Sequence, residues 1–231
     1  MALPQQPIAA KYNRLTKLTT LYFDTVAGRK SHDYYVMGSV SWPEGMMDGF
    51  ALLAGQDQHD GRIQVYREYT FKTVDHWILP NGELKQHGFL SFLADAWKDF
   101  QCRSFFYHQD EEVHRRYSLE VYQCDRISPK PEFIRVLYSG QEIGDNVIDE
   151  MGRLQKLPLN TTLGPDGKPN SKLYQGLIEY RTMRDAEPKK PFVNEAVHAL
   201  RCLLGGYVFN KPPRPRENHG LIELPWVKRN W

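Results

Sequence analysis

The segment FLSFLADAWKDFQCRSFFYHQDEE, residues 89–112, decides the fold class. Its first half repeats apolar residues at three- and four-residue spacing, which predicts an amphipathic helix that packs one face on a sheet. Residues 103–108 follow at once and have the aromatic composition of a short strand. We therefore expect this strand to join the sheet as a crossover strand after the helix.

Strand-like segments precede that helix, and helical segments follow the crossover strand. The predicted strands are residues 18–25, 34–41, 50–54, 62–71 and 119–124. The predicted later helices are residues 146–155, 172–184 and 193–207, the last ending at Gly205 and Gly206. This order predicts an α/β protein in which a mixed central sheet carries helices on its faces.

The length of 231 residues suits one large domain. We expect residues 1–17 to form a flexible arm, residues 18–210 the folded domain, and residues 211–231 a basic tail that contains proline and tryptophan. The formal net charge is only +2, so any affinity for nucleic acid requires positive charge that is concentrated locally. The arm and the tail could supply it, although ordinary solvated charge at the termini is the simpler interpretation.

Cysteine usage indicates a reducing compartment, because Cys102, Cys124 and Cys202 are odd in number and far apart. No apolar run approaches the ~18 residues of a membrane helix, and the first residues lack the apolar stretch of a signal peptide. We therefore expect a cytoplasmic protein without a membrane span.

Acidic side chains follow two of the predicted strands. Asp24 lies in an otherwise apolar strand, and Asp110 and Glu111 come directly after residues 103–108. If the two strands are parallel neighbours, these acids share the sheet edge where open α/β sheets place their sites, and their oxygens suit Mg²⁺ or Mn²⁺. The alternatives are a loop cap for Asp24 and a helix N-cap for Asp110.

A third acid, Glu195, stands in the first turn of the last predicted helix, and His198 lies one turn further on a neighbouring face. Both could reach the same site. However, the helix dipole alone favours an acid at this position, and a lone helical histidine is usually structural. The phosphate-binding motifs GxGxxG and GxxxxGK[ST] and the nucleophile motif GxSxG do not occur, which argues against nucleotide binding in the usual ways.

Three motifs resemble the nuclease domain of phage large terminases, which belongs to the RNase H-like superfamily. They are YFDTVAGRKSHDYYVMGSVS at residues 22–41, SFFYHQDEE at residues 104–112, and NEAVHAL at residues 194–200. The resemblance implies an RNase H-like mixed sheet and a divalent-metal-dependent endonuclease that cleaves double-stranded DNA with two Mg²⁺ or Mn²⁺ ions. It also implies a role in DNA packaging in the host-cell cytoplasm.

The resemblance assigns residues as well. The implied catalytic and metal-binding acids are Asp24, Asp110 and Glu195, with Asp33, Glu111 and His198 as supporting or alternative groups. The implied phosphate-binding residues are Arg29, Lys30, Lys211, Arg214 and Arg216. The C-terminal tail would contact other packaging proteins, such as an ATPase subunit or a portal.

Two other functions remain open. Asn194 and His198 stand where the family has acids, which favours a non-catalytic RNase H-like module that holds DNA or a protein partner. A small-molecule enzyme or ligand binder could instead use the aromatic residues Trp42, Tyr66, Trp77 and Tyr107.

Overall fold

The computed structural model describes most of the central part of the chain. The described residues are 9–13, 18–22, 33–57, 63–72, 81–85, 88–136, 171–187 and 193–210.

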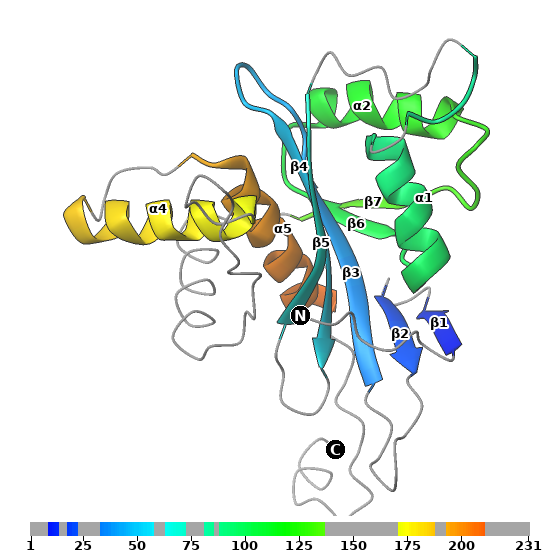
Figure 1. Ribbon diagram of the computed structural model, residues 1–231, viewed down its shortest axis with the longest axis horizontal. Coiled ribbons are helices and arrows are strands. Elements are labelled where there is room, and N and C mark those ends of the chain that lie inside the picture. The colour runs from blue at the N-terminus through cyan, green and yellow to red at the C-terminus, as the bar shows by residue number, and fades with distance from the viewer. Residues whose placement is uncertain are drawn as a thin grey trace, which may run out of the picture.

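One mixed, seven-stranded sheet organises the molecule (Figure 1). Antiparallel neighbours follow one another along the chain, and their bounds are β1 Ala9–Asn13, β2 Leu18–Tyr22, β3 Asp33–Ser41, β4 Gly49–Asp57 and β5 Ile63–Phe71. The chain then crosses through α1 (Phe89–Phe100) to β6 (Ser104–Tyr107), which lies parallel to β3. A second crossover through α2 (Glu111–Gln123) leads to β7 (Glu132–Arg135), which is parallel to β6. The mixed α/β architecture is therefore confirmed.

Strand β3 has different neighbours along one edge. Its first residues pair with β2, from Asp33 with Tyr22 to Val36 with Thr19. Its later residues Gly38 and Ser39 pair with β6. Both neighbours therefore lie on the side of β3 opposite β4.

The middle of the sheet is buried on both faces, because successive strand residues point to opposite faces and helices cover each face. On one face, Val40 and Leu53 pack with α1 and α2 around Trp42. On the other face, Met37 and Leu52 pack with α4 (Lys172–Ala186) and α5 (Glu195–Asn210). Figure 1 shows α1 and α2 on the opposite side of the sheet from α4 and α5.

Helix α5 approaches the sheet closely because Gly206 has no side chain. A Cβ atom at this position would lie 2.2 Å from the Phe106 ring of β6. The helix continues to Asn210, so the expected end at Gly205 and Gly206 is wrong. These glycines mark a close contact rather than a helix terminus.

Other expectations are confirmed or corrected. Helices at 89–100, 172–184 and 193–207 are confirmed within a few residues, whereas the expected helix 146–155 lies outside the described residues. The expected strand at residues 119–124 is wrong, because those residues continue α2. Residues 9–13 were expected in a flexible arm and instead form β1.

The condition that residues 18–25 and 103–108 form parallel neighbouring strands is not met by the described strands β2 and β6. Strand β2 is antiparallel to β3, and β6 is parallel to β3, so β2 and β6 run in opposite directions. The carboxyl end of β2 therefore lies beside the start of β3.

Candidate functional site

The carboxyl ends of the parallel strands β3 and β6 form the candidate site. β3 ends at Ser41, and His108 and Gln109 follow β6 directly. This is the edge of an α/β sheet at which ligand sites commonly lie. Helix α5 crosses the same region and brings His198 to it.

Three side chains at this edge are joined by hydrogen bonds, and we call Ser41, Gln109 and His198 the Ser41 cluster. Gln109 Nε2 donates to Ser41 Oγ at 2.9 Å and lies 3.4 Å from His198 Nδ1. Ser41 Oγ lies 3.1 Å from the same His198 Nδ1. The Gln109 amide nitrogen can only donate, whereas His198 Nδ1 donates or accepts according to its tautomer.

The electrostatics of the cluster keep His198 neutral near pH 7. Burial, followed by the nearby His108 and Arg201, lowers the pKa of His198 to about 4. The His108 and His198 rings are 6.1 Å apart between centroids. His108 Nδ1 contacts the backbone carbonyl of Val136 at 2.7 Å, and this contact holds its ring in place.

Ser41 and Gln109 are inaccessible to a large substrate, because Ser41 is 1% exposed and Gln109 is 7% exposed, whereas His198 is half-buried. Gln109 Nε2 also lies 3.4 Å from the carbonyl of Trp42, so its side chain contacts both the end of β3 and α5. Chemically, the arrangement is a neutral network that fastens a helix to a sheet edge.

The acids after β6 begin a helix. Asp110 is the N-cap of α2, and its Oδ1 accepts a hydrogen bond of 2.8 Å from the backbone N–H of Glu112. Glu111 and Glu112 occupy the exposed first turn, where the helix dipole favours negative charge. The N-cap alternative for Asp110 is therefore what the structure shows.

The start of α5 has a similar arrangement. Asn194 Oδ1 accepts hydrogen bonds from the N–H groups of Ala196 at 3.0 Å and Val197 at 3.1 Å. Glu195 stands in the first turn beside this cap. The asparagine that the resemblance treats as a lost acid thus caps a helix here.

The part of the chain that the structure describes includes Asp110 and Glu195, two of the three predicted metal-binding acids. Within it, no three His, Cys, Asp or Glu side chains are grouped as metal ligands. Asp33 begins β3, roughly 26 Å along the strand from Ser41 at 3.3 Å per residue. Asp110 and Glu195 flank the Ser41 cluster without forming a ligand group with it.

Several predicted residues lie outside the described ranges. They are Asp24 and the five basic residues Arg29, Lys30, Lys211, Arg214 and Arg216. Their assigned roles stay predictions.

Two residues of the cluster were missed from the sequence. Ser41 and Gln109 are neutral and belong to no motif, so chemistry-bearing residue types do not identify them. Their signal is positional, because each is a polar residue at the end of a buried strand.

Comparison with known proteins leaves the family of the chain open. No protein-family model, curated protein or solved structure matches it.

The described helices are all too short or too polar to cross a bilayer.

Proposed function

We propose that this chain is an RNase H-like module that works by binding a partner and not by hydrolysis. The proposed fold is supported by the chain order of the sheet, with antiparallel strands first and two helical crossovers to parallel strands afterwards. Helices on both faces agree with the mixed, flanked sheet that the terminase resemblance implies.

One observation carries the non-catalytic proposal. At the carboxyl ends of β3 and β6, Ser41, Gln109 and His198 hydrogen-bond to one another. A two-metal nuclease needs clustered carboxylates in such a place, since hard cations bind through charged oxygens. This neutral network, in which Ser41 Oγ already accepts from Gln109, offers no comparable set of charged oxygens among the described residues.

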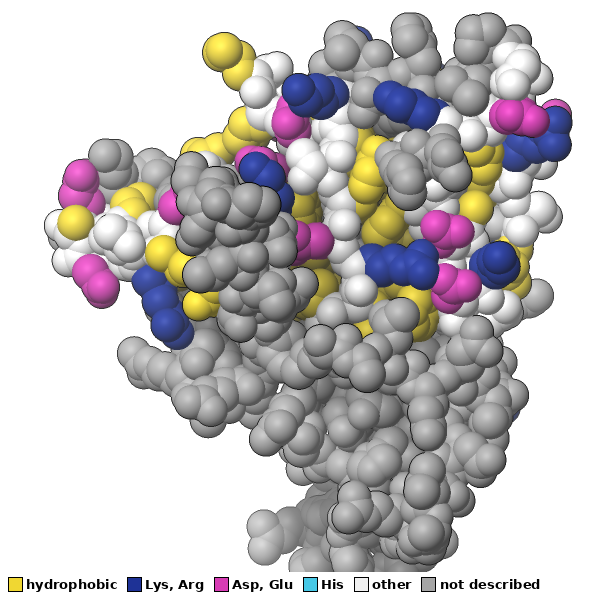
Figure 2. Space-filling model, viewed as in Figure 1, with side chains coloured by type: hydrophobic (Ala, Val, Ile, Leu, Met, Phe, Trp, Pro, Cys, Tyr) yellow, Lys and Arg dark blue, Asp and Glu magenta, His cyan; other side chains and the backbone are white. Residues whose placement is uncertain are grey.

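The proposed partner is DNA or another protein. Figure 2 shows that Lys and Arg side chains are interspersed with Asp and Glu on the described part of one face. This face therefore lacks, in its described part, the concentrated positive charge of a nucleic-acid-binding surface. Binding to DNA would instead rely on the basic residues predicted near residues 29–30 and 211–216.

The decisive experiment is a nicking assay on supercoiled plasmid with Mn²⁺, Mg²⁺ or EDTA, using the full chain. We expect no cleavage under any condition. Metal-dependent nicking that disappears in Asp24→Ala, but persists in the surface control Asp185→Ala, would overturn the proposal. Duplex DNA affinity at low and moderate salt then separates the partners, because phosphate contacts weaken steeply as salt rises.

The second candidate is the divalent-metal endonuclease. Its supporting observation is that Asp110, at the start of α2, and Glu195, at the start of α5, belong to segments joined by the Gln109–His198 contact. The described acids do not fit a metal group, so no catalytic step follows from them. The nicking assay decides between the candidates.

A further inference from the structure

We draw no further inference here: the strongest candidate, the open cleft of about 600 Å³ along α2 that Val113, Arg116 and Leu119 help to line, carries charged side chains of both signs, and nothing in the described part of the structure shows what covers it.

Discussion

Single side chains at the starts of helices explain much of the candidate site. Asp110 and Asn194 each use one side-chain oxygen to satisfy backbone N–H groups that a helix leaves without partners. Both caps lie beside the Ser41 cluster, so they also set where α2 and α5 begin. Asp110 and Asn194 at this edge therefore act as hydrogen-bond acceptors for backbone N–H groups.

The cap at Asp110 can be separated from a metal-binding role by substitution. Asp110→Ala should lower the free energy of unfolding by about 1 kcal/mol, because the Glu112 N–H loses its acceptor. Asp110→Ser should be nearly neutral, since serine is also a good N-cap. Urea denaturation measures both. Equal destabilisation by alanine and serine would show that the carboxylate charge matters more than the cap.

At Gly206, the packing predicts that alanine destabilises the protein, which is the opposite of what helix propensity predicts. Gly206→Ala should favour the helix locally but destabilise the protein by about 1–3 kcal/mol, because the new methyl group overlaps the Phe106 ring. The double variant with Phe106→Leu should show a coupling that recovers part of this loss. Purely additive effects in denaturation experiments would mean that the contact is not close.

The sequence reveals which residues are polar, but it does not reveal what they bond to. Compared with the terminase motif, Asn194 looks like a lost acid. Its role as a helix cap is seen only in the structure, where its Oδ1 accepts from the backbone N–H groups of Ala196 and Val197. The same holds for Gln109, whose partners are 68 residues and 89 residues away in the chain. Contacts between residues so far apart in the chain leave no pattern in the local spacing of residue types.

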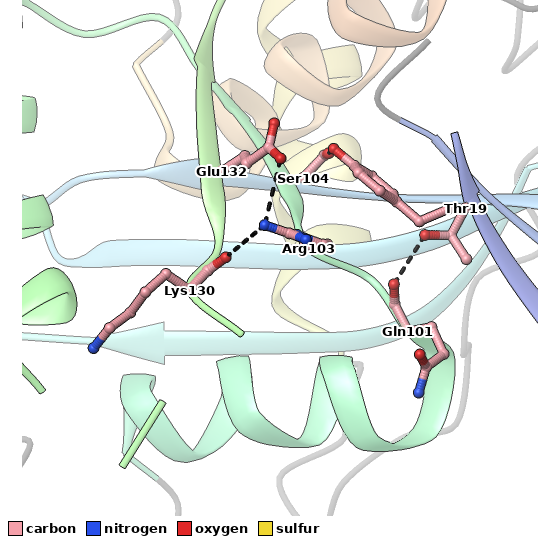
Figure 3. Close-up of polar contacts among 7 residues, drawn as sticks. Thr19, Gln101, Arg103, Ser104, Lys130 and Glu132 are labelled. Atoms are coloured by element: carbon pink, nitrogen blue, oxygen red, sulfur yellow. Dashed lines mark hydrogen bonds and ion pairs between the residues drawn. The ribbon is translucent and has the colours of Figure 1, made fainter. Parts of the chain in front are cut away.

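At the scale of elements, the β1–β2 hairpin is attached to the start of β6 by polar contacts. Thr19 Oγ1 donates to the carbonyl of Gln101 at 2.9 Å, and Arg103 lies 3.5 Å from Glu132 of β7 (Figure 3). The Arg103 guanidinium also stacks over the Tyr12 ring, 5.2 Å from its centre. These contacts tie β1 and β2 to both crossover strands.

Deletion of residues 1–17 therefore tests the hairpin as a structural part. The deletion removes β1, the Tyr12–Ser104 hydrogen bond and the cation–π contact, so we expect a loss of about 1–2 kcal/mol in urea denaturation. Deletion of residues 1–8 is the control that keeps β1. A dispensable arm would instead leave both midpoints unchanged.

Helix α4 depends on a carboxylate from another element. Glu68 of β5 accepts hydrogen bonds from the N–H of Lys172 at 2.7 Å, the N–H of Leu173 at 3.3 Å and the Ser171 hydroxyl at 2.9 Å. The negative charge also complements the amino end of the helix dipole.

Glu68→Ala should therefore reduce the free energy of unfolding by about 1–2 kcal/mol, with the loss of protection concentrated in α4. The measurements are urea denaturation and hydrogen exchange. Glu120→Ala, an exposed residue of α2, is the matched control and should change stability by less than about 0.5 kcal/mol. Uniform loss of protection along the chain would contradict a local role for Glu68.

Spacing predicted the long amphipathic helices well and failed at α2. The residues from Leu119 to Cys124 alternate in a strand-like way, but Tyr117 and Val121 are buried one helical turn apart. The helix results from the Asp110 cap and from packing around Trp42, which is stacked on Tyr117. Tertiary contacts of this kind override local propensity.

At the scale of the whole molecule, two apolar cores share the central strands β3 and β4. Cys102 and Cys124 are buried in the core beneath α1 and α2, and Cys202 is buried in the core beneath α5. Since neighbouring residues of the same strands enter both cores, one core cannot lose its packing without disturbing the other. We expect a single cooperative unfolding transition.

The cysteines can report that transition. Native thiols should react with iodoacetamide at least ~100-fold more slowly than in the unfolded chain, because buried thiols rarely form the reactive thiolate. Burial raises the pKa of Cys102 to about 12. Pulse labelling in urea should then modify Cys102 and Cys202 at the same midpoint. Separate midpoints would show that the two faces open independently.

The divided edge of β3 has a further consequence for how the sheet can vary. β2 and β6 pair with successive stretches of the same edge of β3, and the boundary between these stretches lies near Met37. A longer hairpin strand would have to take pairing positions from the crossover strand, and a longer crossover strand would displace the hairpin. β2 and β6 therefore limit each other's length, and the sheet can be extended only at its outer strands.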